Sequence, residues 1–232
     1  MTDKNSLRTS CTVDNAHCEC FDLLTEEQNQ IIEKNMVTVE YEKGEVIAKQ
    51  GSFASHIVFL CDGLLKVYYE SKKVKLILKI VGPGSLVGLT SLTGEKQVFN
   101  YTASAYVDSV AKLIPVNVFN EMIENNGRFA SKIISILSEN TNQINGRFFC
   151  LTHRQSYGKL ADILLCLAGN IFKNQRFELL LTRKELAELA GMSTESVIRM
   201  LKKFQDDNLI EITGKTFFLK DPEELQKICE LG

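Results

Sequence analysis

The segment STESVIRMLKKF, residues 193–204, carries side chains that could contact the edges of nucleobases. An arginine can pair with O6 and N7 of guanine, a glutamate can accept from the N4 amine of cytosine, and an apolar side chain can pack on the thymine methyl group. If the segment is a helix, its apolar residues face inward and four residues of its first turns project outward. The inward residues are Val197, Met200, Leu201 and Phe204. We predict base-reading roles for Thr194, Glu195, Ile198 and Arg199.

A simpler interpretation pairs Glu195 with Arg199 in an i,i+4 surface salt bridge, which would contribute only about 0.2–0.5 kcal/mol to stability. That interpretation leaves Ile198 exposed without a reason. We therefore favour base reading.

Positive charge near this segment is local, as expected for a chain whose net charge is −2. Lysine, arginine and hydroxyl side chains can contact phosphates and so orient a protein on a duplex without specifying sequence. The alternative is a solvated surface. The candidate phosphate contacts are Lys159, Arg183, Lys184, Ser193, Ser196, Lys202, Lys203 and Lys215.

The elements that must position these residues are two helices and a hairpin. Thr182 and Glu185 have the spacing of a capping box, the helix that they begin ends at Gly191, and Ser193 caps the next helix. Two helices joined by a tight glycine turn are typical of a helix-turn-helix. The following LIEITGKTFFLKD predicts two strands joined at residues 213–215, which would form a wing.

The first half of the chain has a different pattern. Residues 37–115 contain short β-rich runs separated by turn glycines, which favours an antiparallel β-roll or barrel. Thr25 and Gln28 predict a short capped helix before it. Residues 1–20 form a polar arm with few apolar residues to anchor it.

Between these regions, apolar residues recur at steps of three and four, as in a coiled-coil seam. One helix over residues 117–151 would be about 50 Å long, which suggests a second copy of the chain as its partner. A polar Asn140 within the seam could fix the register. The alternative is a long helix that lies on its own β-roll. The predicted seam residues are Ile133, Leu137, Asn140, Ile144, Phe148 and Leu151.

Composition limits the classes of protein. With 232 residues and 44% hydrophobic content, the chain can bury a core in two compact units. No run approaches the roughly 20 apolar residues of a membrane span, and residues 1–20 do not resemble a signal peptide. Seven scattered cysteines do not suggest a disulfide framework. We expect a cytoplasmic protein with reduced thiols and no membrane partner.

In this order, these elements resemble the cyclic AMP receptor protein and fumarate-nitrate regulator (CRP/FNR) family of transcription factors. The resemblance is carried by LTRKELAELAGMSTESVIRMLKKF and, in the roll, by the GxxxxxxG, DGLLKVYY and GPGSLVGL turns. It implies an α+β fold with an N-terminal antiparallel β-roll (double-stranded β-helix), a long dimerisation helix and a C-terminal winged helix-turn-helix. The expected parts are an arm at 1–20, the roll at 21–116, the dimerisation helix at 117–152 and the DNA-binding domain at 153–232.

The resemblance also implies partners. These are double-stranded DNA with a palindromic operator, a second copy of the chain, and RNA polymerase. In the family, the Glu and Arg that match Glu195 and Arg199 read a G·C-containing half-site. Thr194 and Ile198 match neither of the two best-known members, so the rest of the half-site is not implied.

The resemblance leaves the effector unknown. Family members that bind cyclic nucleotides use a Glu and an Arg-Ser pair, whereas this chain has Leu89 at the Glu position and Val98 and Phe99 near the Arg-Ser position. A buried phosphate needs a cation or several amides to replace its water, so we expect no cyclic AMP binding. The candidate effector-pocket residues are Leu86, Gly88, Leu89, Val98 and Phe99.

Cysteines near the N-terminus raise the alternative of an iron-sulfur cluster, which the family's redox-sensing members bind with N-terminal cysteines and one cysteine of the roll. Here the best match to the roll cysteine is Ala111, so Cys61 or His17 would have to replace it. The simpler interpretation is free thiols on the arm. The candidate ligands are Cys11, Cys18, Cys20 and Cys61.

Two rival functions fit the sequence less well. A cupin-like oxygenase needs convergent histidine and carboxylate ligands, but only one of the three histidines, His56, lies in the roll. The other rival is a metal- or redox-binding or interaction protein whose helical tail no longer binds DNA. Because Glu195 and Arg199 are intact, we predict a DNA-binding regulator that is not an enzyme.

Overall fold

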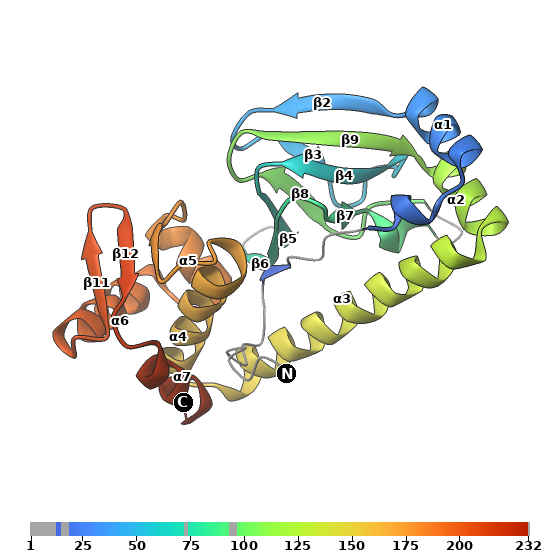
Figure 1. Cartoon of the computed structure of the whole chain (residues 1–232). Coiled ribbons are helices and arrows are strands. Elements are labelled where there is room, and N and C mark those ends of the chain that lie inside the picture. The colour runs from blue at the N-terminus through green and yellow to red at the C-terminus, as the bar shows by residue number, and fades with distance from the viewer. Residues whose placement is uncertain (1–12, 15–18, 72–73, 93–96, 232) are drawn as a thin grey trace, which may run out of the picture. The chain divides into compact units, whose positions relative to one another are not determined.

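The computed structural model describes residues 13–14, 19–71, 74–92 and 97–231. The chain divides into two compact units, one formed by residues 14–142 and the other including residues 143–232. Figure 1 shows that most strands belong to the first unit, whereas the second is mainly helical with a small sheet.

The first unit contains the predicted antiparallel β-roll. One sheet has the order β1-β6-β5-β8-β3 and the other the order β2-β9-β4-β7. Its strands are β1 (Val13–Asp14), β2 (Val37–Tyr41), β3 (Val46–Ala48), β4 (His56–Asp62), β5 (Leu65–Ser71), β6 (Val74–Val81), β7 (Leu86–Val87), β8 (Thr102–Ala105) and β9 (Ser109–Pro115). The long pairings β5–β6 and β4–β9 are antiparallel, as the alternating β-rich runs predict.

Small and branched side chains fill the core of the roll. Val58, Leu60, Val67 and Ala103 are among the residues that pack there, each no more than 2% exposed. The turn between β4 and β5 requires Gly63, whose φ of +90° favours glycine and whose position would bring a Cβ atom into Ser109. The turn glycines therefore set the strand connections.

Helices pack beside the roll in a second core cluster. They are η1 (Phe21–Leu23), α1 (Glu26–Asn35), η2 (Leu89–Ser91), α2 (Val116–Asn125) and α3 (Gly127–His153). The predicted capping box of α1 is present, with Gln28 N donating to Thr25 Oγ1 at 3.2 Å. Phe119 and Phe129 are both fully buried, with ring centroids 5.3 Å apart.

The predicted helix over residues 117–152 is interrupted once, because the chain leaves helical geometry at Asn126. Asn126 has φ −139° and ψ 98°, and its Oδ1 accepts from the backbone amides of Arg128 and Phe129. This side chain caps the N-terminus of α3, as asparagine commonly does. The remaining helix α3 has 27 residues and is roughly 40 Å long.

Two predicted seam residues of α3 face their own unit instead. Ile133 is 3% exposed and belongs to the second core cluster. The Oδ1 of Asn140 accepts from Lys79 Nζ of β6 at 2.6 Å, so Asn140 is engaged within its own chain. The alternative of a helix that lies on its own roll is therefore correct for this face of α3.

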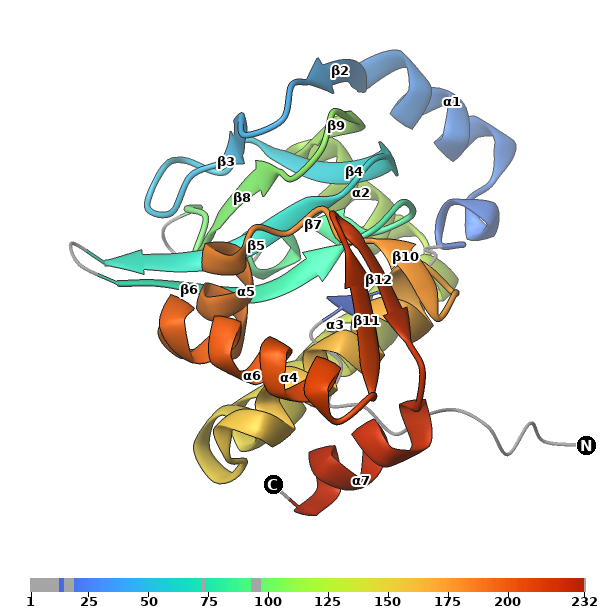
Figure 2. The same ribbon diagram turned by 90° about the vertical axis from the view of Figure 1, so that its left-hand side faces the viewer.

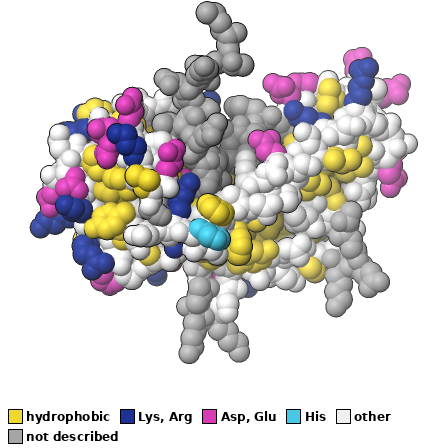
Figure 3. All heavy atoms as spheres, turned by 90° about the horizontal axis from the view of Figure 1, so that it is seen from below, with side chains coloured by type: hydrophobic (Ala, Val, Ile, Leu, Met, Phe, Trp, Pro, Cys, Tyr) yellow, Lys and Arg dark blue, Asp and Glu magenta, His cyan; other side chains and the backbone are white. Residues whose placement is uncertain are grey.

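A different row of α3 residues carries the exposed apolar surface. Ile134, Ile144 and Phe148 are 63%, 51% and 67% exposed. With Leu137, Thr141 and Leu151 they recur at alternating steps of three and four, which places them on one stripe. Relative to the prediction, Ile134 replaces Ile133 and Thr141 replaces Asn140. Figure 3 shows hydrophobic side chains at the molecular surface on this side of the molecule.

The second unit has the predicted winged helical arrangement. Its elements after α3 are α4 (Ser156–Cys166), the π-helical turn η3 (Leu167–Ile171), β10 (Arg176–Glu178), α5 (Arg183–Ala190), α6 (Thr194–Asp206), β11 (Ile210–Thr213), β12 (Thr216–Leu219) and α7 (Pro222–Leu231). Strands β11 and β12 form the expected hairpin, and β10 pairs with the other edge of β12. Figure 2 shows this hairpin beside α6.

The expectation of reduced thiols throughout is wrong for Cys20, which is buried and disulfide-bonded. The other cysteines that the structure describes, at positions 61, 150, 166 and 229, are not in disulfides. In the described ranges no helix has both the length and the apolar character needed to cross a membrane.

Candidate nucleic-acid interface

Helices α5 and α6 are joined by a turn whose local chemistry follows the sequence closely. The Oγ1 of Thr182 accepts from Glu185 N at 3.2 Å, and the Glu185 carboxylate accepts in return from Thr182 N at 3.0 Å. Gly191 ends α5 with φ +62°, in the left-handed region where glycine is favoured. Ser193 then caps α6 by accepting from Ser196 N at 3.2 Å. These contacts fix where α5 begins and ends and where α6 begins.

The inner face of α6 is buried as predicted. Val197, Met200, Leu201 and Phe204 are each at most 3% exposed. They meet an equally buried face of α5, on which Leu186 and Ala190 are fully enclosed. At about 1.5–3 kcal/mol for each large apolar side chain removed from water, this burial holds α6 in one rotational setting. The opposite face must then point to solvent.

That opposite face contains the predicted base-reading residues. Ile198 is 53% exposed, Glu195 and Arg199 are exposed, and Thr194 is half-buried. In the described part of the chain, no salt bridge joins Glu195 to Arg199, so the simpler interpretation of this pair is not what the structure contains. Both charged groups remain available to a partner.

The carboxyl group of Glu195 is held in its ionised form. Its own backbone amide and the Ser193 hydroxyl donate to the carboxylate and lower its pKa below the ordinary value. An ionised carboxylate only accepts hydrogen bonds. Glu195 is therefore suited to accept from an exocyclic amine such as cytosine N4.

The predicted phosphate contacts fall into two groups. Lys184, Ser193, Lys202 and Lys215 are exposed, while Lys159, Arg183 and Ser196 are half-buried. Lys203 is exposed but engaged, because its Nζ lies 2.9 Å from the Oδ1 of Asp207. The guanidinium carbon of Arg183 lies 5.0 Å from the ring centroid of Phe217, and burial lowers the pKa of Arg183 from its ordinary value.

A shallow groove beside α6 includes residues that the sequence did not single out. Its volume is about 480 Å³, and Gln205 and Ile212 line it together with Ile198, Arg183 and Lys202. Gln205 lies two turns beyond the exposed Ile198 on the same face of α6 and could have been found from helical spacing alone. Ile212 belongs to β11, so only the folded hairpin brings it close.

A buried polar cluster supports the helix-turn-helix from behind. Asp162 of α4 is fully buried, and its Oδ1 lies 2.8 Å from Arg154 Nη1. The thiols of Cys150 and Cys229 donate to its two carboxylate oxygens, at 3.7 and 3.5 Å. This cluster ties α4 to α7 and to the end of α3. A single acidic residue within the apolar run LADILLCLAG was its only signal in the sequence.

Two family models match the chain in the order of its two units. The model described as a cyclic nucleotide-binding domain matches residues 38–126, and the Crp-like helix-turn-helix domain matches residues 158–228. The chain belongs to the CRP/FNR family of transcription regulators. The CRP/FNR resemblance predicted from sequence is confirmed, and so are the fold class and the helix-turn-helix DNA-binding domain.

Curated relatives of this CRP/FNR regulator are distant but extend along most of its length. It is 24% identical to the regulatory protein HlyX of Actinobacillus pleuropneumoniae, covering 96% of both chains. It is also 24% identical to electron transport regulator A of Shewanella oneidensis, covering 81% of this chain and 76% of the relative.

Solved structures give the same fold. The c-di-GMP responsive global regulator CLP of Xanthomonas campestris superimposes with a TM-score of 0.73 at 20% identity, covering 84% of this chain and 99% of CLP. A mutant of CooA from Carboxydothermus hydrogenoformans superimposes with a TM-score of 0.74 at 17% identity, covering 96% and 98%.

The predicted effector-pocket residues of this CRP/FNR regulator are divided between two core clusters. Leu86 and Leu89 pack beside α1, α2 and α3, whereas Phe99 packs in the core of the roll. Gly88 has φ +102°, and a Cβ atom there would lie 3.2 Å from the Phe99 ring. Val98 is half-buried and bridges to Phe53.

The predicted cluster ligands are only partly described. Cys11 and Cys18, with His17, lie outside the described residues. Cys20 is disulfide-bonded, and Cys61 is half-buried with its thiol 3.9 Å from the Phe59 carbonyl. Over the described ranges, no three His, Cys, Asp or Glu side chains converge as a metal site would require.

Proposed function

We propose that this regulator binds a palindromic operator as a homodimer and reads each half-site with the outer face of α6. The observation that carries the proposal is the exposure of Glu195, Ile198 and Arg199 on a helix whose other face is fixed by burial. Arg199 would pair with guanine, Glu195 would accept from cytosine, and Ile198 would contact a thymine methyl group. Thr194 would contact the same base edges from the first turn.

Phosphate contacts would position this helix in the major groove. Lys184, Lys202 and Lys215 are exposed lysines on α5, on α6 and in the wing turn. Such contacts supply affinity that depends on salt but carry no sequence information. Lys203 would contribute less, because Asp207 already neutralises it at 2.9 Å.

The homodimer is supported by the apolar stripe on α3. Ile134, Ile144 and Phe148 are more than half exposed, and large side chains in a 3-4 repeat are the usual contact of a two-stranded coiled coil. A two-fold dimer presents two recognition helices to half-sites about 34 Å apart. The palindromic operator follows from that symmetry. By likeness to its family, the DNA-bound dimer would contact RNA polymerase.

We propose further that the effector is not cyclic AMP. The backbone amide of Gly88, which a bound phosphate could otherwise use, donates to Tyr101 Oη at 3.0 Å. Leu89 and Phe99, at or near the positions of the family's nucleotide-binding residues, are apolar and supply no positive charge to an anion. A phosphate at the Gly88 amide would have to break this hydrogen bond to Tyr101, which is unfavourable.

Selection from a pool of random duplexes tests the proposal. The full chain should enrich an inverted repeat whose half-sites contain a G·C pair and whose centres are about one helical turn apart. Enrichment of no sequence, or of a single isolated half-site, would contradict it.

A further inference from the structure

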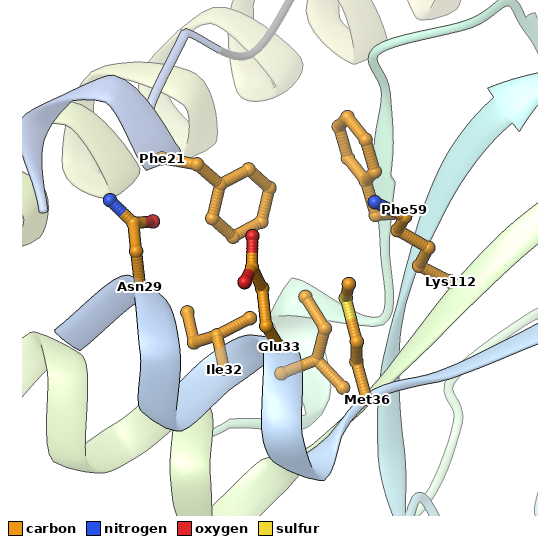
Figure 4. A pocket seen from close by; sticks show the side chains of 8 residues that line it. Phe21, Asn29, Ile32, Glu33, Met36, Phe59 and Lys112 are labelled. Atoms are coloured by element: carbon orange, nitrogen blue, oxygen red, sulfur yellow. The ribbon is translucent and has the colours of Figure 1, made fainter. Parts of the chain in front are cut away.

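A cavity of about 120 Å³ lies in the first unit between α1 and the sheet that contains β4 and β9. Its apolar lining includes Phe21, Ile32, Met36 and Phe59. The Phe21 and Phe59 rings meet edge to face, with centroids 5.1 Å apart and an interplanar angle of 84°. Figure 4 shows these side chains around the cavity. The arrangement would enclose a small apolar group.

Opposite charges stand on two sides of this apolar lining. Glu33 and the amide of Asn29 come from α1, and Lys112 comes from β9, where its ammonium lies beside Phe59 (Figure 4). In the described part of the chain, neither Glu33 nor Lys112 belongs to a salt bridge. The cavity therefore offers one anionic group, Glu33, and one cationic group, Lys112, and neither is in a salt bridge with another described residue.

We propose that this cavity binds a small α-amino acid with a branched aliphatic side chain. The ligand's ammonium group would donate to Glu33 and the Asn29 carbonyl, and its carboxylate would accept from Lys112. Its side chain would enter the apolar lining. Charge-assisted hydrogen bonds of this kind are about twice as strong as neutral ones.

The volume selects the size of the side chain. An engineered apolar cavity of about 150 Å³ accommodates benzene, so a cavity of about 120 Å³ suits a branched chain of four carbons better than an indole ring. A zwitterion can keep its charged groups at the solvent-exposed rim, where Glu33 is exposed. The class that fits is represented by leucine.

None of the residues that line this cavity is a predicted effector-pocket residue or part of the DNA-binding helix, although Phe59 pairs with Leu86 across β4 and β7. Its lining residues come from η1, α1, β4 and β9 and the residues next to them. Binding of the amino acid does not depend on the proposed operator binding. The two can fail independently.

Isothermal titration calorimetry of the full chain with L-leucine tests the proposal. Two analogues separate the charges, because 4-methylpentanoate lacks the ammonium group and 3-methylbutylamine lacks the carboxylate. L-Tryptophan tests size. L-Leucine should bind with one site per chain, and each of the three other compounds should bind at least about tenfold more weakly.

Variants of the lining residues test whether the measured heat of leucine binding comes from this cavity. Glu33→Gln and Lys112→Met should each weaken leucine binding about tenfold. Glu27→Gln and Lys34→Met, which make the same charge changes on α1 outside the cavity, should leave it unchanged. The proposal is overturned if leucine does not bind at millimolar concentration, if 4-methylpentanoate binds as well, or if the control variants weaken binding equally.

Discussion

Arg154 and Asp162 form a buried ion pair, with 2.8 Å between Nη1 and Oδ1, at the junction of α3 and α4. Arg147 lies about two turns before Arg154, on the same side of α3. It is 4% exposed, and no residue that the structure describes forms a hydrogen bond with its Nε, Nη1 or Nη2. Burial lowers the pKa of Arg147, and Cys150 and Asp162 only partly oppose that effect. Among the described residues, the Arg154 guanidinium therefore has a carboxylate partner, whereas the Arg147 guanidinium has no hydrogen-bond acceptor.

Arg147→Met should stabilise the protein. Methionine keeps an unbranched apolar stem and removes a buried charge to which the described residues offer no acceptor, so the free energy of unfolding should rise by about 1–3 kcal/mol. Urea denaturation at fixed protein concentration measures the change. Arg154→Met is the matched control, and it should destabilise by about 3–5 kcal/mol because it leaves Asp162 buried and unpaired. A loss of stability in Arg147→Met would contradict the assignment.

Cys229 should make stability fall at alkaline pH. Burial, with Asp162 nearby, raises the pKa of its thiol from 9.0 to about 12. The unfolded thiol ionises above pH 9 while the folded thiol stays protonated, so stability is intact below pH 9 and decreases as the pH rises toward 12. Cys229→Ser should reduce the slope of unfolding free energy against pH by up to about 1.4 kcal/mol per pH unit in this window. Equal slopes of unfolding free energy against pH in the wild type and in Cys229→Ser would show that the folded state does not raise the pKa of this thiol.

A side chain at position 191 should destabilise the protein. Its φ is +62°, and an added Cβ would lie 3.0 Å from Leu151 Cδ2. Gly191→Ala should therefore cost about 1–3 kcal/mol of stability, which thermal and urea unfolding can measure. Gly169→Ala is the control, because nothing lies within 4 Å of its Cβ position and its φ is not positive. Equal effects of the two substitutions would argue against strain at the turn.

Phe148 should be central to dimerisation. It is 67% exposed on the apolar stripe of α3, and an aspartate there would bury a charge at the contact of the proposed homodimer. Phe148→Asp should weaken the dimer by at least about 2 kcal/mol, as sedimentation equilibrium would show. Ser135→Asp adds the same charge on the opposite side of α3 and should have little effect. If Phe148→Asp leaves the dimer dissociation constant unchanged, the dimer interface does not include this stripe.

Local signals predicted the fold well. Both capping boxes, Gly191 and the strand runs between glycines depend on contacts within a few residues, so the sequence is sufficient to identify them. The inner and outer faces of α6 followed from helical spacing for the same reason. These features determine where elements begin and which face is buried.

Long-range contacts were not predictable in the same way. Ile133 and Ile134 have the same residue type, and only the packing of α3 on its own roll decides which of them is buried. The spacing predicts a seam position for Asn140, but its partner Lys79 lies 61 residues away in the sequence, so no local signal reveals the contact. The break at Asn126 depends on contacts with Leu23 and Gln28 about 100 positions earlier. Periodicity identifies a face but not the surface that covers it.

Base reading by α6 is tested most directly by Arg199→Ala, measured by fluorescence anisotropy on the selected operator and on random duplex. Lys202→Ala is the control for a phosphate contact, and it should weaken binding to both duplexes alike and lower the salt slope by about 1. Arg199→Ala should lower operator affinity by roughly 1–3 kcal/mol per subunit and leave binding to random duplex almost unchanged. Equal losses on operator and random duplex for Arg199→Ala would contradict base reading.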